Sequence, residues 1–189
     1  MAEAALRSTY AEYLELEASS PEQRYEFVDG AVYAMAGGTS RHSMLAMSLG
    51  AELRAALGAK GCAVYGSDLK IRIDATNRTT YADVFVVCGP DEFSKIDRNA
   101  ITNPTVIIEV LSPSTEASDR GEKFRHYQHL KSLREYVLVS QDSPYIEVFR
   151  RNGDEWVLRT VTAGQVLELP SKGVQIPVDA IYADPRQSR

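Results

Sequence analysis

Two carboxylates lie inside apolar runs of strand length, and they are the residues with the clearest chemical potential. Glu109 interrupts Val106–Leu111, and Asp83 lies near the start of Tyr81–Cys88. Val, Ile and Leu on both faces predict strands buried on both sides. A buried carboxylate without a partner costs several kcal/mol, so each acid is expected to be paired, protonated or bound to a metal.

A lysine is the third unusual residue. Lys123 shares the apolar stripe of the next predicted helix with Phe124, Tyr127 and Leu130, the stripe that should face the sheet. Two acids and a lysine from adjacent elements offer a site for a hard divalent cation such as Mg²⁺, which binds few carboxylates and keeps several waters. The lysine would then orient a water or stabilise charge on phosphorus. The alternative is an internal ion-pair network without metal.

The elements that would position these residues follow from capping, periodicity and turn signals. The expected order is helix, hairpin, helix, three strands, helix, three strands, which predicts an α/β fold with a mixed central β-sheet flanked by helices. The predicted helices span residues 8–18, 41–57 and 114–130, and the hairpin turns at Asp29-Gly30. The predicted strands span residues 62–73, 81–88, 106–111, 135–140, 145–150 and 156–162, with 74–80 as a turn, 90–103 as a loop and 167–182 wrapped around the sheet edge.

Composition bounds the class of protein. The 189 residues fit one domain, with 44% hydrophobic and 25% charged residues, as in ordinary globular proteins. A net charge of −5 argues against a strongly basic protein that coats nucleic acid. Cys62 and Cys88 lack metal-ligand spacing and are predicted to be free buried thiols in a reducing cytosol. No apolar run reaches membrane length and no secretory signal is visible, so we expect a cytoplasmic protein without a membrane partner.

Three further polar residues are candidates for supporting roles in the same cleft. His42 follows the predicted helix cap at Thr39 or Ser40 and lies on the face of Leu45, so it could look into a site at the helix start. A hydrogen-bonded or partly solvated first-turn histidine is the competing interpretation. Glu26 and Asp68 could contribute in the same way, or serve only in turns or on the surface.

The joint pattern resembles a known family. Residues 25–30 (YEFVDG), 81–84 (YADV) and 108–115 (IEVLSPST), with Lys123 and Tyr127, are similar to the restriction-endonuclease family often called Uma-two, within the PD-(D/E)XK nuclease superfamily. The resemblance covers residues 10–182, the expected core of a single nuclease-like domain spanning 1–189.

The resemblance implies a restriction-endonuclease-like core that hydrolyses DNA phosphodiester bonds with Mg²⁺ or Mn²⁺. Asp83 and Glu109 would bind the metal together with the backbone carbonyl of Val110, Lys123 would complete the catalytic set, and Tyr127 would support it. A homodimer is compatible with this expectation, because such nucleases often pair to cut two strands.

The sequence departs from the superfamily's motif at two positions. Ala82 replaces a proline, which is chemically minor, whereas Leu111 stands where a lysine is expected two residues after Glu109. Lys123 must then act from the helix. The alternative function is a nuclease-fold protein that has lost turnover and serves as a binding or accessory module.

Overall fold

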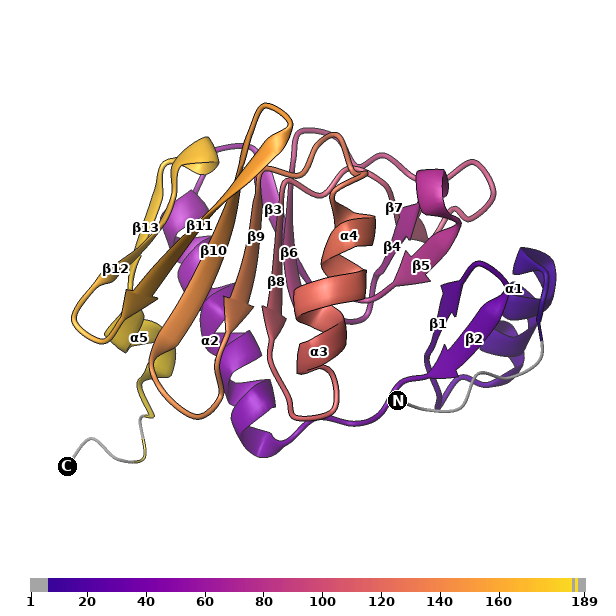
Figure 1. Cartoon of the computed structure of the whole chain (residues 1–189), viewed down its shortest axis with the longest axis horizontal. Helices are drawn as coiled ribbons and strands as arrows, with labels where there is room; N and C mark the ends of the chain where they lie inside the picture. The colour runs from indigo at the N-terminus through magenta and orange to yellow at the C-terminus, as the bar shows by residue number, and fades with distance from the viewer. Residues whose placement is uncertain (1–6, 185, 187–189) are drawn as a thin grey trace.

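A six-stranded mixed sheet forms the centre of the molecule (Figure 1). The computed structural model describes residues 7–184 and 186. The strand order is β11-β10-β9-β8-β6-β3; β8 and β9 run parallel, and the other neighbours run antiparallel. The bounds are β3 (Cys62–Gly66), β6 (Val84–Cys88), β8 (Val106–Val110), β9 (Glu135–Val139), β10 (Tyr145–Asn152) and β11 (Glu155–Thr162).

A helical crossover joins the parallel strands β8 and β9 and covers one face of the sheet. It comprises α3 (Glu116–Ser118), a π-helical segment η2 (Asp119–Lys123) and α4 (Phe124–Tyr127). The helix is therefore shorter than the predicted 114–130. Phe124 and Tyr127 pack with Phe85 and Ile107 of the sheet. Parallel strands need such a crossover, and this one carries its side chains over the end of β8.

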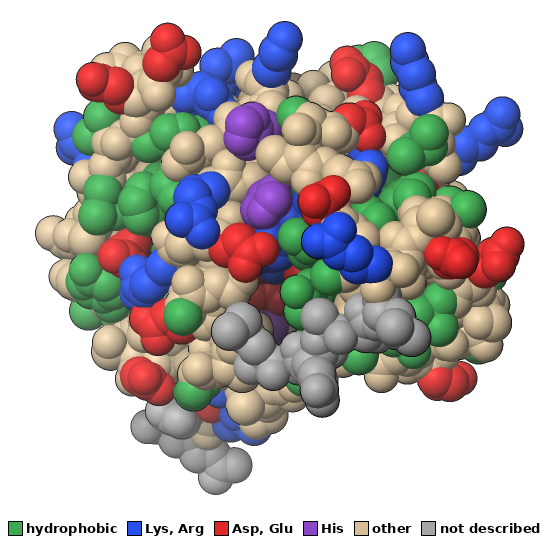
Figure 2. Space-filling model, turned by 45° about the vertical axis from the view of Figure 1, so that its right-hand side comes forward, with side chains coloured by type: hydrophobic (Ala, Val, Ile, Leu, Met, Phe, Trp, Pro, Cys, Tyr) green, Lys and Arg blue, Asp and Glu red, His purple; other side chains and the backbone are tan. Residues whose placement is uncertain are grey.

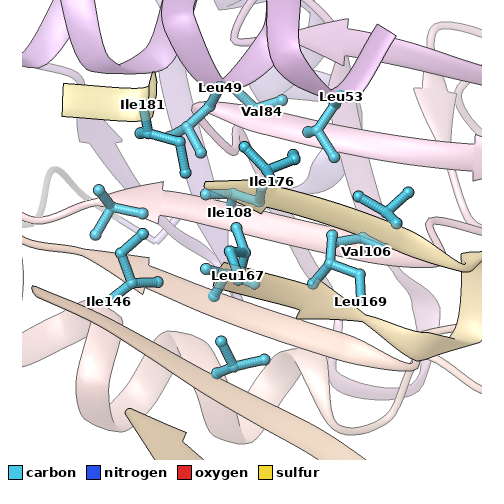
Figure 3. Packing of buried hydrophobic residues seen from close by; sticks show 14 of the residues in the cluster. Leu49, Leu53, Val84, Val106, Ile108, Ile146, Leu167, Leu169, Ile176 and Ile181 are labelled. Carbon is cyan, nitrogen blue, oxygen red and sulfur yellow. The ribbon is translucent and has the colours of Figure 1, made fainter. Parts of the chain in front are cut away.

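The opposite face is covered by α2 (Ser40–Leu57), a two-stranded hairpin and α5 (Val178–Tyr182). The leucines at positions 45, 49, 53 and 57 are buried on one side of α2, as their i, i+4 spacing predicts. They join Ile108 and Ile146 of the sheet and Ile176 of the hairpin in one core (Figure 3). The hairpin consists of β12 (Val166–Leu169) and β13 (Val174–Pro177), joined by η3 (Pro170–Lys172). The tail thus covers a face of the sheet, and its predicted position at the sheet edge is wrong.

A second sheet, in the order β2-β1-β5-β4-β7, carries the N-terminal unit. Thr9 caps α1 (Tyr10–Ser19) in a reciprocal capping box with Glu12. The turn at Asp29-Gly30 has positive φ at both residues, as an Asp-Gly hairpin requires. Pairing of β1 with β5 brings this unit against the rest of the fold. The bounds are β1 (Tyr25–Val28), β2 (Ala31–Ala34), β4 (Lys70–Ile73), η1 (Asp74–Thr76), β5 (Arg78–Thr80) and β7 (Ala100–Ile101).

Four sequence-based expectations need correction. The predicted strand 62–73 is two strands, β3 and β4, which belong to different sheets. The predicted turn 74–80 contains β5, and the predicted loop 90–103 contains β7. Cys62 and Cys88 form a disulfide, because antiparallel pairing of β3 and β6 sets them opposite each other.

Of the helices in the described ranges, none is both long and apolar enough to cross a membrane.

Candidate active site

The two predicted acids meet where β6 begins and β8 ends. Val84 of β6 lies opposite Ile108 of β8, so Asp83 and Glu109 are the next residues outward along this antiparallel pair. The backbone N–H of Val110 donates to Asp83 Oδ2 at 2.7 Å, and the backbone nitrogen of Asp83 lies 3.4 Å from Glu109 Oε2. Strand pairing therefore holds the two carboxylates side by side.

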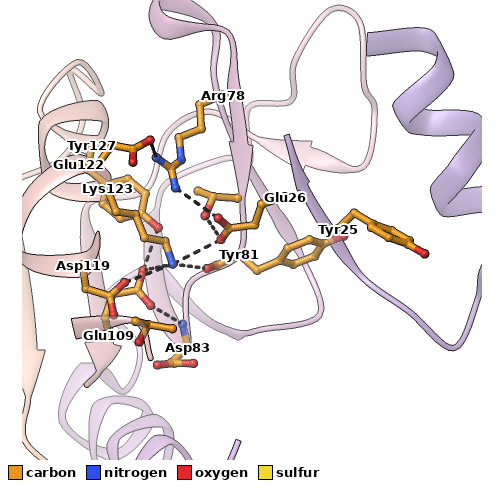
Figure 4. Close-up of polar contacts among 12 residues, drawn as sticks. Tyr25, Glu26, Arg78, Tyr81, Asp83, Glu109, Asp119, Glu122, Lys123 and Tyr127 are labelled. Carbon is orange, nitrogen blue, oxygen red and sulfur yellow. Dashed lines mark hydrogen bonds and ion pairs between the residues drawn. The ribbon is translucent and has the colours of Figure 1, made fainter. Parts of the chain in front are cut away.

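The crossover helix brings Lys123 and Tyr127 to the same place (Figure 4). Lys123 Nζ lies 3.0 Å from Glu109 Oε1, and the Tyr127 hydroxyl donates to the same oxygen at 2.9 Å. Lys123 also donates to the backbone carbonyl of Tyr81 at 3.0 Å. The sequence-predicted residues Asp83, Glu109, Lys123 and Tyr127 thus form one contiguous cluster, with Val110 at its edge.

Two more carboxylates flank Lys123. Glu26, from β1, lies 3.5 Å from Lys123 Nζ and also pairs with Arg78 at 3.2 Å. Asp119, one turn before Lys123 on the helix, lies 3.7 Å from it and is buried. Glu26 therefore lies beside the cluster, which is the first of the two alternatives that the sequence left open for it. Asp119 and Arg78 were not predicted, although the i, i+4 spacing of Asp119 to an inward-facing lysine could have indicated the former.

Burial and crowding of like charge set the protonation of the cluster. Burial raises the pKa of Glu109 to about 8; Lys123 opposes this shift, while Asp119 and Asp83 add to it. Burial also raises the pKa of Asp119. The pKa of Lys123 is raised despite its burial, because Glu109, Glu26 and Asp119 all favour its charged form. Lys123 therefore stays charged, whereas Glu109 keeps its proton until the pH approaches about 8 in the metal-free fold.

The cluster fits a hard divalent cation on donor chemistry. Asp83 uses Oδ2 for the Val110 N–H, and Glu109 uses Oε1 for Lys123 and Tyr127. Among the described residues, Asp83 Oδ1 has no hydrogen bond, and Glu109 Oε2 has only the 3.4 Å contact with a backbone nitrogen. Each acid thus keeps one oxygen available. In the described parts of the chain, His, Cys, Asp and Glu side chains form no metal-binding group of three or more, so a cation here would complete its shell with carbonyl, water or substrate oxygens, as Mg²⁺ does.

A groove leads to this cluster from the side of Asp83. It has a volume of about 1210 Å³ and runs along the outer side of α2, between the N-terminal unit and β3. We call it the α2 groove; its lining includes Arg24, His42, Gly50, Tyr65 and Asp83. On the face drawn in Figure 2, acidic side chains lie recessed in a hollow with Lys, Arg and His side chains around them.

The two remaining predicted residues differ in position. His42 Nε2 lies 3.1 Å from Asp83 Oδ2, so it adjoins the cluster. Asp68 lines the α2 groove instead, with a side chain that is 87% exposed and paired with Arg24. Asp68 thus lies in the loop between β3 and β4, which was predicted as continuous strand, and its exposed position matches the turn or surface alternative.

Comparisons with known proteins agree with one another. Residues 10–179 match a family model described as "Putative restriction endonuclease". Two uncharacterized proteins of Synechocystis sp. are similar: slr1290 is 41% identical over 90% of this chain and 89% of its own length, and sll1609 is 32% identical over 85% and 90%. A crystal structure titled as a putative nuclease belonging to DUF820, from Anabaena variabilis, has a TM-score of 0.74 at 16% identity, covering 93% of this chain and 97% of that one, which shows a shared fold.

Proposed function

Because the chain belongs to the Uma2 family, whose model is described as "Putative restriction endonuclease", we propose that it is a metal-dependent endonuclease that hydrolyses DNA phosphodiester bonds. The observation that carries this proposal is the juxtaposition of Asp83 and Glu109 at the ends of paired strands, with Lys123 Nζ 3.0 Å from Glu109. A structural ion pair needs one carboxylate for one lysine, whereas this cluster holds several.

Asp83, Glu109 and the carbonyl of Val110 would hold the cation, Mg²⁺ or Mn²⁺. When bound, the metal supplies a nucleophilic water and neutralises charge on the phosphate. Lys123 has three N–H donors. Glu109 and the Tyr81 carbonyl accept at 3.0 Å, and the other two carboxylates lie 3.5 Å or more away. One donor can therefore turn to a phosphate oxygen, which would stabilise the charge that builds up in the transition state.

The α2 groove gives the substrate its access. The side chains of Glu109 and Lys123 are only 4% and 10% exposed, whereas that of Asp83 is 19% exposed and lines the groove. A scissile phosphate would therefore approach from the side of Asp83, and Glu109 and Lys123 would act from the inner wall.

The test is cleavage of duplex and single-stranded DNA by purified protein with Mg²⁺, with Mn²⁺ and with EDTA. Wild type should cut only with metal, and Asp83→Ala and Glu109→Ala should abolish cleavage while keeping the fold. Lys123→Met should lower the single-turnover rate by 10²-fold or more while Mn²⁺ still binds. Glu155→Ala, which removes an exposed carboxylate on β11, is the matched control. Full activity in either acid mutant would contradict the assignment.

A second candidate is a nuclease-fold binding module without turnover. The observation in its favour is that Lys123 is engaged by Glu109, Glu26 and Asp119 at once, as in an internal ion-pair network. Leu111, where a lysine is expected, is buried against Phe124 and Tyr127. Calorimetry separates the two functions. If the cluster is only an ion-pair network, the wild type binds no Mn²⁺. DNA binding should then also persist when Asp83 or Glu109 is replaced.

A further inference from the structure

His42 touches the most exposed acid of the cluster from outside it. His42 Nε2 lies 3.1 Å from Asp83 Oδ2, the oxygen that also accepts the Val110 N–H at 2.7 Å. The side chains of His42 and Asp83 are both 19% exposed. Two donors therefore converge on one carboxylate oxygen, and Oδ1 is left without a hydrogen bond from the described residues.

The start of α2 fixes the histidine. Thr39 caps the helix by accepting the His42 N–H at 3.1 Å. The Thr39 hydroxyl donates to Gln141 Oε1 at 2.7 Å, and Gln141 Nε2 donates to the carbonyl of Leu111 at 2.6 Å. This chain of hydrogen bonds ties the first turn of α2 to Leu111, the residue that follows β8. It therefore fixes the position of His42 relative to the end of β8, where Glu109 lies.

A glycine provides the space for the imidazole ring. A Cβ atom at Gly38 would lie 3.0 Å from His42 Nδ1 and 3.3 Å from its Cγ. Contacts of that length force the neighbour to shift. The lack of a side chain at Gly38 therefore lets the ring lie where its Nε2 reaches Asp83.

We propose that His42 is a positioning residue for Asp83. Its Nε2–H and the Val110 N–H clamp Oδ2 and thereby leave Oδ1 for the cation, so His42 sets the orientation of a ligand without binding the metal. The inference rests on the metal site of the proposed function. Hydrogen-bond partners of metal ligands generally contribute 10- to 100-fold in metal affinity, since they fix the orientation of the ligand.

Mn²⁺ titration of the metal-free protein tests this, followed by calorimetry and by the loss of the free-ion electron paramagnetic resonance signal. His42→Ala should weaken Mn²⁺ binding by about 10- to 100-fold. His42→Gln should restore most of the affinity, because its Nε2 can donate from a similar place. Gly38→Ala should weaken binding without removing the imidazole. Ser43→Ala, an exposed neighbour in the same helical turn, should leave the affinity unchanged. Circular dichroism and melting temperature check the fold of each variant.

The outcomes separate this inference from the proposed function. Unchanged affinity in folded His42→Ala overturns the positioning role while the metal site stands. Tighter Mn²⁺ binding in His42→Ala also overturns it, because the ring would then compete with the cation for Asp83. Failure of His42→Gln to recover any affinity points to a role of the ring other than donation and likewise contradicts the proposal. A wild type that binds no Mn²⁺ overturns both ideas.

Discussion

The pKa values of the carboxylates around Lys123 shift in different directions. Burial outweighs the attraction of Lys123 at Glu109 and raises its pKa to about 8. At Glu26, burial acts in the same direction, but Lys123 and Arg78 together overcome it and lower the pKa. Two cations and a hydrogen bond from the Thr80 hydroxyl act on Glu26, whereas Glu109 has one cation and two neighbouring acids, Asp119 and Asp83. Glu109 is thus the acid whose charge the metal-free fold tolerates least.

Glu109→Gln should therefore stabilise the protein in EDTA near pH 8. A carboxyl whose folded pKa is raised contributes stability below its unfolded pKa, near 4.5, and that stability is lost as the pH rises through about 8. Glutamine keeps the shape without the charge, and the gain should be on the order of a few kcal/mol at most, since one pKa unit is worth about 1.4 kcal/mol. Urea unfolding between pH 4 and pH 9 measures it.

Glu26→Gln is the matched control for that experiment. Its pKa is lowered in the folded state, so its charge stabilises the fold above an unfolded pKa near 4.5, and that contribution is lost as the pH falls through the lower folded value. Glu26→Gln should accordingly destabilise the protein at pH 8. Equal effects of the two substitutions would contradict the assignment of opposite shifts.

At the scale of single residues, the sequence identified the charged residues that interrupt apolar strands and an apolar helical stripe. A carboxylate in an apolar strand and a lysine on an apolar helical stripe pointed to Asp83, Glu109 and Lys123, and the structure brings them together. Arg78 gave no such signal, because it lies in a short polar segment, and only the pairing of β1 with β5 brings it to Glu26. The sequence left Asp68 between a supporting and a surface role, and the loop that exposes it was predicted as strand.

At the scale of elements, the crossover helix determines how many groups reach the acids. Its π-helical segment η2 begins with Asp119 and ends with Lys123, and both side chains are buried against the sheet. Single π turns widen a helix locally and are frequent at functional sites. Sequence periodicity predicted a helix here but assumed a uniform 3.6-residue repeat, which contains no information on such an insertion.

Gly121 lies within η2 and offers a test of that segment. No atom lies within 4 Å of a Cβ built there, and its φ is not positive. Gly121→Ala should therefore stabilise the fold by about 0.5–1 kcal/mol, because alanine loses less backbone entropy in a helix. Denaturant titration measures this. Gly58→Ala is the contrasting control, since Gly58 has a φ of +48° and alanine there should destabilise. Loss of stability in Gly121→Ala would show that η2 needs the freedom of glycine.

Strand pairing explains the element-level errors. The sequence predicted β6, β8 and the three strands that follow the crossover. The buried strands among them, β6, β8 and β9, have a strong composition signal. It could not reveal that residues 62–73 change sheets midway or that three polar residues form β5, because both depend on partners distant in sequence. The Cys62–Cys88 disulfide was missed for the same reason: the cysteines are 26 residues apart, and only the register of β3 against β6 sets them opposite each other.

At the scale of the whole molecule, the layers leave the α2 groove as a route to the acids. The crossover helix covers the cluster on one side of the sheet, and α2, the C-terminal hairpin and α5 fill the other (Figure 1). The α2 groove remains open between the N-terminal unit and β3 and ends at Asp83. Its lining consists largely of small or apolar residues, with Tyr65 as an aromatic wall. Its charged residues are two arginines and three acids: Arg24, Arg54, Glu22, Asp68 and Asp83. The groove thus presents both signs of charge, although the chain as a whole has a net charge of −5.

Gly50→Trp should obstruct that route without touching the acids. Gly50 lines the groove eight residues after His42, about 12 Å along α2, and a Cβ there meets no atom within 4 Å. The indole would project into the path of a DNA strand. We expect at least a 10-fold rise in KM for DNA, with Mn²⁺ affinity unchanged. Hydrolysis of bis-p-nitrophenyl phosphate, which needs no long groove, should persist. Ala55→Trp, on an exposed part of the same helix outside the groove lining, controls for the added surface tryptophan. If Gly50→Trp and Ala55→Trp cut DNA with the same KM as wild type, the substrate reaches Asp83 from another side.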